Sequence, residues 1–288
     1  MNELTQDIHW YPGHMAKAKR RIIEALPNID MVIELLDARA PLSSRNPDFK
    51  EIFKNKPVLT LLTKSNLADR NATAGFLRAL SGENARARAI DCKTGYGIKD
   101  ISASINELMA EKLARDAARG IKRPVRAMVA GITNVGKSTF INTLCGQKKA
   151  AAADKPGVTR QNARVSVPSL GIELTDTPGL LWHKFDDREV GIKLACLGSI
   201  NDDILDVWGL ALELLNILKA RYPQCVTARY GVPASPEDDV NALFESIAKK
   251  RGFIRAGGVI DEERAASVIL DEFRAGKIGQ ITLDRITQ

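Results

Sequence analysis

The chain of 288 residues is 44% hydrophobic and 27% charged, which is long and apolar enough to bury the cores of about two domains. Its 42 Lys and Arg outnumber its 35 Asp and Glu, and the resulting formal net charge of +7 favours a polyanionic partner. The sequence has no apolar run of about 18 residues, no secretion signal, no CxxC pair and no Cys/His cluster. We therefore expect a reduced, cytoplasmic protein with no membrane partner and no structural zinc.

In chain order, short β-branched apolar runs alternate with amphipathic segments up to residue 187. Strands are predicted at 31–36, 57–62, 88–90, 125–130, 163–167 and 171–175, and helices at 47–53, 72–80, 98–119 and 137–145. This alternation predicts an α/β fold with a doubly wound, mostly parallel sheet. Beyond residue 187 only helical patterns remain, at 188–197, 204–221, 236–250 and 261–275. We therefore predict an α/β domain at 1–187, with a basic N-terminal segment, and an all-helical domain at 188–288.

The segment Gly131–Ser138 matches G-x-x-x-x-G-K-[ST] directly after one predicted strand and at the start of the next helix. Its glycines let main-chain N–H groups and a helix N-terminus surround phosphate oxygens, which an ordinary strand-to-helix turn has no need to do. Lys137 is expected to neutralise the β- and γ-phosphates and Ser138 to ligate Mg²⁺. The predicted nucleotide contacts in this phosphate loop are Asn134, Val135, Gly136, Lys137, Ser138 and Thr139.

Asp176-Thr177-Pro178-Gly179, the DTPG loop, ends the last predicted strand. Taken alone it fits a plain turn equally well, but beside a phosphate loop Asp176 is expected to hold Mg²⁺ and the Gly179 N–H to meet the γ-phosphate. Between the two loops, Thr159 lies in a Pro-Gly-containing segment suited to close over the same metal.

The segment expected to read the base lies upstream of the phosphate loop, not downstream. Thr63-Lys64-Ser65-Asn66, the base loop, follows the second predicted strand, and Asp91-Cys92-Lys93, the second base loop, follows the third. The predicted base contacts are Thr63, Lys64, Asn66, Asp91, Cys92 and Lys93. These segments resemble the five motifs of GTPases, here in the order G4-G5-G1-G2-G3. That order is a circular permutation that leads both switch segments straight into the helical domain. This order predicts a nucleotide-gated two-state device.

With these motifs, the segments 10–18, 36–47, 176–187 and 250–253 give the resemblance. Over nearly its whole length the chain resembles the YlqF/RbgA group of circularly permuted GTPases. The resemblance implies a Mg²⁺-dependent GTPase that binds GTP and GDP, associates with a late precursor of the large ribosomal subunit, contacts rRNA and leaves after hydrolysis. We expect a monomer away from the ribosome.

Leu180 occupies the position where Ras-like GTPases carry the glutamine that orients the attacking water. The resemblance assigns that catalytic role to His14, alongside Lys137; the alternative is that His14 merely caps the basic helix 16–26. The resemblance also makes Asn134 a candidate K⁺ ligand, although an Asn in a loop has an ordinary turn role as well.

The base loop departs from the GTPase pattern at Asn66, where the pattern has Asp. An amide offers one acceptor where guanine presents two donors, so selectivity for guanine is expected to weaken. Asp69, three residues later, could replace Asn66 as the base contact only if the base loop shifted its register, and that shift would misplace Lys64. Two alternatives therefore stay open: a nucleotide-gated RNA-binding module with negligible hydrolysis, and a phosphate-loop NTPase that uses another base.

Three basic clusters occur, at 14–21, at 115–126 and at 249–255. Charge runs are usually solvated faces, but three of them in a chain of this net charge favour salt-sensitive contact with an RNA phosphate backbone. Since no RRM, KH or double-stranded RNA module is visible, such recognition would use shape and electrostatics.

Overall fold

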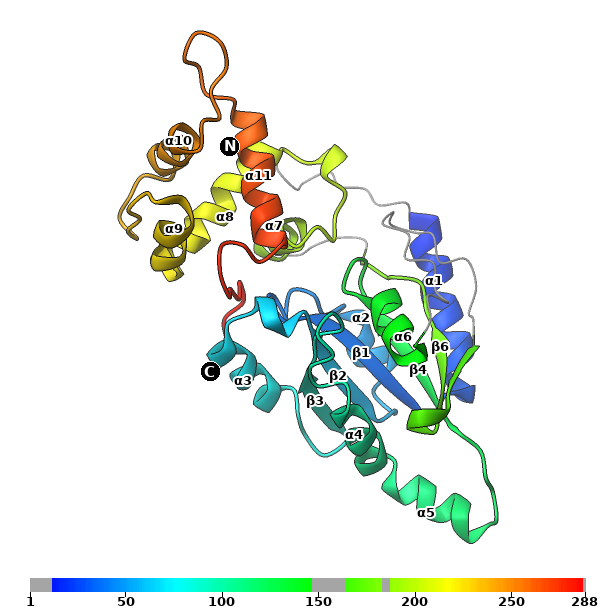
Figure 1. Ribbon diagram of the computed structural model, residues 1–288. Helices are drawn as coiled ribbons and strands as arrows, with labels where there is room; N and C mark the ends of the chain where they lie inside the picture. The colour runs from blue at the N-terminus through cyan, green and yellow to red at the C-terminus, as the bar shows by residue number, and fades with distance from the viewer. Residues whose placement is uncertain (1–11, 147–163, 183–186, 287–288) are drawn as a thin grey trace. The chain divides into compact units, whose positions relative to one another are not determined.

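The computed structural model describes residues 12–146, 164–182 and 187–286 (Figure 1). These residues form two compact units. The first contains residues 12–182 together with 284–286, and the second contains residues 187–283. The sequence-based boundary after residue 187 assigns the end of the chain to the second unit, whereas the contacts group residues 284–286 with the first.

The first unit is built on a six-stranded sheet with the order β3-β2-β1-β4-β6-β5. The strands are β1 (Met31–Asp37), β2 (Val58–Thr63), β3 (Ala85–Ala89), β4 (Val125–Gly131), β5 (Arg164–Val167) and β6 (Ile172–Asp176). All neighbours are parallel except β5, which pairs antiparallel with β6 at the edge. The predicted mostly parallel α/β sheet is confirmed.

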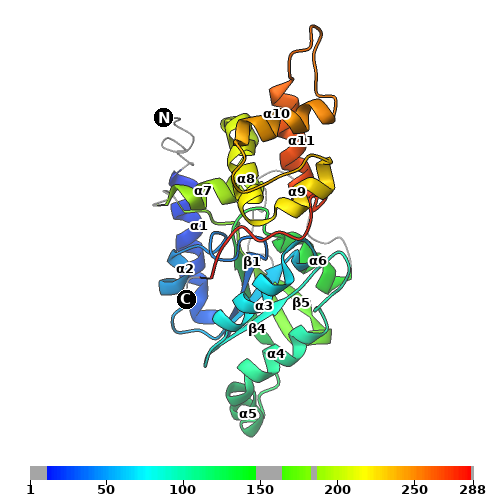
Figure 2. The same cartoon turned by 90° about the vertical axis from the view of Figure 1, so that its left-hand side faces the viewer.

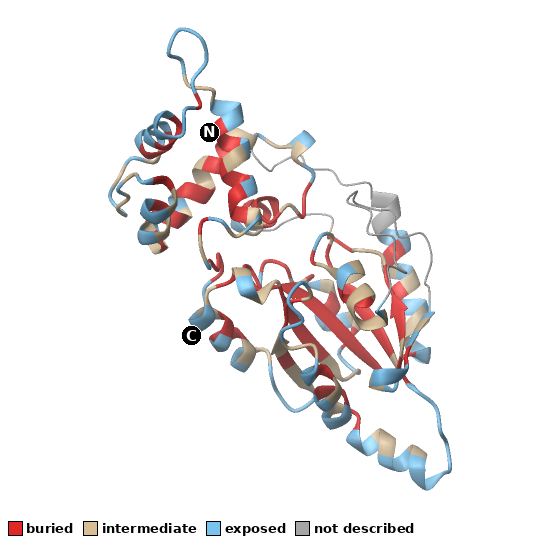
Figure 3. Ribbon diagram, in the orientation of Figure 1, coloured by how far each residue is buried: buried red, intermediate tan, exposed pale blue. Residues whose placement is uncertain are grey.

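The central strand β1 is buried at every position, as expected for a parallel strand covered on both faces (Figure 3). Val32 and Leu36, four positions apart, lie on the same face of β1. The apolar clusters around them include residues of helices α1 (Pro12–Ala25), α2 (Asp48–Ile52) and α3 (Arg70–Ala79), so these helices cover that face. Figure 2 shows α1 and α2 side by side. The unit also contains α4 (Asp100–Leu108), α5 (Ala110–Ala118) and α6 (Lys137–Cys145).

Strand order decides where the candidate site lies. The chain moves outward from β1 to β2 and β3 and then returns to β4 on the other side of β1. In such sheets ligands bind at the carboxyl ends of the strands, where the order reverses. The loops after β1, β2, β3, β4 and β6 therefore lie at one edge of the sheet, although they are spread along the sequence between residues 37 and 179.

Apart from shifts of up to four residues at the ends of other elements, three elements differ from the sequence prediction. β3 is longer than expected because its Ala-Arg alternation follows strand periodicity without forming an apolar run. The helix predicted at 98–119 is interrupted at Met109, whose φ of −104° and ψ of 8° leave the helical region, and the second half, α5, buries none of its residues. An unpredicted helix, α9 (Pro223–Tyr230), begins with Pro223, since proline is accepted in the first helical turn.

The second unit is helical within its described residues and contains one isolated β-bridge, between Ile254 and Ile260. Its helices are α7 (Arg188–Cys196), α8 (Val207–Arg221), α9, α10 (Val240–Lys250) and α11 (Glu262–Arg274). The Asp residues that precede α7, α8, α10 and α11 each accept a main-chain N–H of the first turn, which stabilises the helix start. None of the described helices combines the length and apolar character needed to cross a bilayer.

Candidate functional site

The phosphate loop joins β4 to α6 at the shared edge of the sheet. Gly136 has a φ of 104°, a conformation that favours glycine, and it directly precedes the first residue of α6. Asn134 also has a positive φ, 56°, which Asn tolerates better than most residues. A Cβ on Gly131 would lie 2.8 Å from the carbonyl oxygen of Leu35 in the neighbouring strand. The sequence motif therefore occupies the positions where its glycines are needed.

Lys137 lies with its ammonium group inside the loop. Its Nζ donates to the carbonyl oxygens of Gly131, at 3.1 Å, and Ile132, at 2.6 Å. Burial lowers the pKa of Lys137 to about 8, although the nearby Asp176 carboxylate opposes the shift. The group is thus poorly solvated and prepared to exchange neutral carbonyls for an anion.

The DTPG loop lies directly against the phosphate loop. Asp176 is opposite Val129 in the β4–β6 pairing, and the Thr177 hydroxyl donates to the Val129 carbonyl oxygen at 2.7 Å. A Cβ on Gly179 would lie 3.0 Å from Lys137 Nζ and 3.1 Å from the Thr133 main chain, which is tighter than an ordinary van der Waals contact, so glycine favours this close approach. The two motifs, about forty residues apart, are brought together as their chemistry requires.

The donor set here fits a magnesium ion. Asp176 is buried, and its Oδ1 has no hydrogen-bond partner among the described residues, although burial raises the pKa of this carboxyl and Lys137 only partly opposes the shift. Ser138, the last residue of the phosphate loop, lies in the first turn of α6. No group of three or more His, Cys, Asp or Glu side chains gathers within the described ranges. Mg²⁺ is commonly held by one or two protein oxygens together with phosphate and water oxygens.

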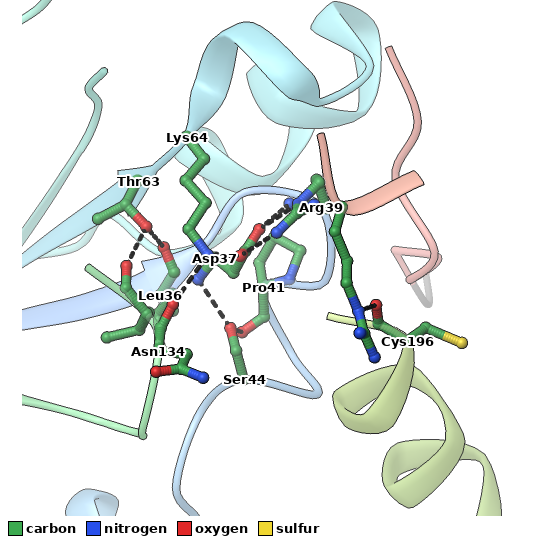
Figure 4. Close-up of polar contacts among 11 residues, drawn as sticks. Leu36, Asp37, Arg39, Pro41, Ser44, Thr63, Lys64, Asn134 and Cys196 are labelled. Carbon is green, nitrogen blue, oxygen red and sulfur yellow. Dashed lines mark hydrogen bonds and ion pairs between the residues drawn. The ribbon is translucent and has the colours of Figure 1, made fainter. Parts of the chain in front are cut away.

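The base loop is fastened to the phosphate loop by two side chains (Figure 4). The Thr63 hydroxyl lies 2.7 Å from the Val135 carbonyl oxygen and 3.1 Å from that of Leu36. Lys64 has a φ of 55°, and its Nζ donates to the Asn134 carbonyl oxygen at 2.8 Å. Threonine in place of the usual asparagine therefore still connects the base loop to the phosphate loop.

Asn66 is exposed in the short helical turn after Lys64, where a base could reach it. Asp69, the considered substitute, caps α3 instead, since its Oδ1 accepts the Ala72 N–H at 2.8 Å. This capping bond gives Asp69 a structural role at the start of α3, and Asn66 therefore stays the predicted base contact.

The second base loop adjoins the base loop through the main chain, because Ser65 N donates to the Ile90 carbonyl oxygen at 3.2 Å. Asp91 is buried and folds the loop by accepting Lys93 N at 3.0 Å and the Thr94 hydroxyl at 2.8 Å. Cys92 has a pKa raised to about 11, mainly by burial, so it remains a neutral thiol. Its carbonyl oxygen lies within 3.5 Å of the hydroxyl of Thr143 in α6.

Sequence reasoning missed a buried charge cluster at the end of β1, formed by Asp37, Arg39 and Lys64. Arg39 Nε and Nη2 donate to the Asp37 carboxylate at 2.9 and 2.8 Å, and Lys64 Nζ donates to it at 2.8 Å (Figure 4). Burial opposes the charge on Asp37, but Arg39 and Lys64 outweigh it and hold the pKa of that carboxyl well below its ordinary value. An Asp-x-Arg sequence directly after an apolar strand was the available signal.

Asp37→Asn is expected to lower the free energy of unfolding by about 3–5 kcal/mol, because the buried Arg39 loses its counter-ion. Asp48→Asn is the matched control: its partner Lys19 and Asp48 itself are about 40% exposed, so about 1 kcal/mol or less is expected. Urea unfolding at pH 7 measures both. Since the folded-state pKa of Asp37 is depressed, its contribution to the free energy of unfolding is present above about pH 4 and is lost on acidification. The stability difference between wild type and D37N should therefore narrow at low pH. Equal midpoints for D37N and wild type at pH 7 would contradict the role of this cluster.

Two predicted site residues cannot be placed. Thr159 lies outside the described residues, and for His14 the structure gives only its position in α1. The residue at the glutamine position of Ras-like GTPases can be placed. This residue, Leu180, is buried in the same apolar cluster as Ala18 and Ile22 of α1. Its side chain therefore cannot orient a water molecule.

The end of the chain also returns to this edge. Asp284 is buried and accepts Leu42 N and Ser43 N, each at 2.8 Å, and the Ser43 hydroxyl at 2.6 Å. Close by in sequence, a Cβ on Gly75 would collide with Ile286. The loop after β1 is thus fixed by a residue more than two hundred positions away.

Comparison with known proteins agrees with this geometry. A family profile described as "50S ribosome-binding GTPase" matches residues 126–219. The chain is 46% identical to Ribosome biogenesis GTPase A of Priestia megaterium over 279 residues, covering 96% of both chains. It is 33% identical to Mitochondrial ribosome-associated GTPase 1 of Xenopus tropicalis, covering 96% of this chain and 94% of that one. The solved structure of GNP-bound YlqF from T. maritima aligns with a TM-score of 0.63 at 26% identity, covering 93% of this chain and 98% of that one.

Proposed function

Because the chain belongs to the ribosome biogenesis GTPase A family, and is therefore a GTP hydrolase of ribosome assembly, we propose that it binds a precursor of the large ribosomal subunit in its GTP state and leaves after hydrolysis. The observation that carries this proposal is the junction of three loops. Thr63 and Lys64 hold the carbonyls of the phosphate loop, and Gly179 lies against Thr133 on its other side. A nucleotide at this junction would be read at its base and at its γ-phosphate together.

The phosphate loop is proposed to hold the β- and γ-phosphates through its main-chain N–H groups and the Lys137 ammonium. Ser138, Thr159 and Asp176 would hold Mg²⁺, which neutralises phosphate charge when bound. Asn134 is the proposed K⁺ ligand. Val135 in the phosphate loop and Thr139 just after it are further proposed nucleotide contacts. Asp91, Cys92 and Lys93 of the second base loop are proposed to contact the base.

His14 is proposed as the group that orients the attacking water. The support is the attachment of α1: Ala18, one helical turn after position 14, and Ile22 pack in the cluster that buries Leu180. The helix that carries His14 is therefore fixed beside the residue that follows Gly179. An imidazole accepts a hydrogen bond from water near neutral pH, which suits the task.

RNA contact is proposed for the basic clusters, which the structure distinguishes by how their charges are paired. In the cluster at 249–255, Lys249, Arg251 and Arg255 form ion pairs with Glu245, Glu272 and Asp261. In the cluster at 115–126, Arg123 and Arg126 form ion pairs with Asp30 and Glu173. Its other members, Arg115, Arg119 and Lys122, are exposed on and after α5, which buries none of its residues. We therefore favour the α5 segment as the first phosphate-backbone contact.

The deciding experiment is multiple-turnover GTP hydrolysis with and without large subunits. Stimulation by subunits, together with binding that weakens steeply as salt rises, is the expected result. Unstimulated hydrolysis with intact subunit binding would favour the alternative, a nucleotide-gated RNA-binding module. Fractionation and sedimentation of the free protein test the proposed cytoplasmic location and the proposed monomer.

Asn66→Asp is expected to tighten GTP binding about tenfold, because a carboxylate accepts both guanine donors where the amide accepts one. Xanthosine triphosphate should bind more weakly to the variant. Asn71→Asp is the matched control, since it adds the same charge at an exposed position of α3. Competition binding with GTP, XTP and ATP gives the measurement. Unchanged GTP affinity in N66D would place the base contact elsewhere, and preference of the wild type for ATP would refute the guanine assignment.

A further inference from the structure

The loop after β1 contains a buried asparagine whose two ends face different partners. Asn46 is about 1% exposed and directly precedes Pro47 at the start of α2. Its Oδ1 accepts Asp48 N at 3.0 Å, an ordinary helix-start contact. Its Nδ2 donates to the carbonyl oxygen of Leu180 at 3.0 Å, 134 positions along the chain. The helix start explains only the first of these bonds.

Leu180 is held on its other side by the phosphate loop, because Leu180 N donates to the Gly131 carbonyl oxygen at 3.3 Å. Both main-chain polar groups of the residue after Gly179 are therefore bonded, one to Gly131 and one to Asn46. The Leu180 side chain is buried in the cluster with Phe49 and Phe53 near α2. The residue after Gly179 is thus fixed by two hydrogen bonds, one on each of its flanking peptide groups, and by apolar packing of its side chain.

We infer that Asn46 is a positioning residue for the DTPG loop. By holding Leu180, Asn46 helps to set the direction in which the Gly179 N–H points toward the γ-phosphate. Of the two bonds on Leu180, only the one from Asn46 comes from outside the motif loops. Asn46 lies in the segment that begins with Asp37, the partner of Lys64. One short stretch, residues 37–46, therefore contacts the base loop through Asp37 and the residue after the DTPG loop through Asn46.

Because a diphosphate lacks the γ-phosphate, the loss of this bond should affect triphosphate binding selectively. In Asn46→Asp the acceptor for Asp48 N remains, while the donor to Leu180 becomes a carboxylate that repels the carbonyl oxygen. We expect N46D to bind a non-hydrolysable GTP analogue about tenfold more weakly, with GDP affinity unchanged within twofold. Its kcat for GTP hydrolysis should fall by at least as much.

Two controls separate positioning from general damage. Asn71→Asp adds the same charge on the surface of α3, and Ile105→Val removes one methylene from a buried position of α4. Both should keep the wild-type ratio of GDP affinity to analogue affinity. Asn46→Ala, which lacks the repulsive charge, replaces N46D if that variant does not fold. In the wild type, the Asn46 side-chain amide protons should exchange more slowly with the analogue bound than with GDP bound.

The inference rests on the proposed nucleotide site, and the wild type tests that site separately. Failure of the wild type to bind the analogue would refute the proposed function. If the wild type binds normally but N46D loses GDP and analogue affinity by the same factor, or keeps both, Asn46 has no positioning role. Equal exchange of its amide protons in the two nucleotide states would likewise exclude that role.

Discussion

Lys137→Ala should lower the affinity for both GTP and GDP at least about a hundredfold. The Lys137 ammonium lies within the phosphate loop on the carbonyls of Gly131 and Ile132 and is largely withdrawn from water. A hydrogen bond from such a cation to phosphate contributes more than a neutral one, and more than one such bond is lost in alanine. Isothermal titration with each nucleotide measures the change.

Lys50→Ala serves as the matched control, because Lys50 is an exposed lysine on α2. It should bind both nucleotides as the wild type does. Thermal unfolding without nucleotide should show that K137A is folded, so that lost binding reflects the missing ammonium. A folded K137A protein that keeps wild-type affinity would mean that the phosphates lie elsewhere.

His14→Ala should lower the rate constant of GTP hydrolysis by a factor of about 10² to 10⁴, the usual contribution of a group that assists proton transfer or orients water. Nucleotide affinity should stay within twofold, because position 14 belongs to α1 and not to the loops that are proposed to hold the phosphates. Single-turnover hydrolysis at saturating GTP, with the analogue affinity measured in parallel, separates these two effects.

Glu24→Gln is the control for α1, since it alters an exposed residue of the same helix and leaves the buried Ala18 and Ile22 in place. Its hydrolysis rate should equal that of the wild type. Loss of affinity in H14A equal to its loss of rate would favour a structural role for His14 at the start of the basic helix.

The sheet could be predicted because buried parallel strands appear as apolar runs, and β1, β2 and β4 are such runs. The positions of the motif loops could be predicted because each loop follows a predicted strand, and the carboxyl ends of parallel strands meet at one edge of the sheet. The predicted β3 is too short because Arg86 and Arg88 prevent an apolar run, so that only the period-two alternation marks this strand.

The contacts of Lys64 with Asp37, of Asn46 with Leu180 and of Asp284 with Ser43 could not be predicted, since each depends on which distant segments the sheet order brings together. Asn46 has no local feature that identifies Leu180 as its partner, and Asp284 follows a stretch without any motif near the end of the chain. Such tertiary hydrogen bonds leave no periodic signal. The amino-acid pattern therefore identifies the loops of the site but not the residues that support them.

The anchoring of Asp284 changes how the helical unit can move. That unit leaves the sheet-containing unit after the DTPG loop and rejoins it at Asp284, so it behaves as an insertion with two tethers, not as a domain on one linker. A single linker permits free tumbling, whereas two connections restrict it. A partner that displaces the helices would therefore act on the sheet-containing unit through both connections at once, after the DTPG loop and at the loop that carries Asn46.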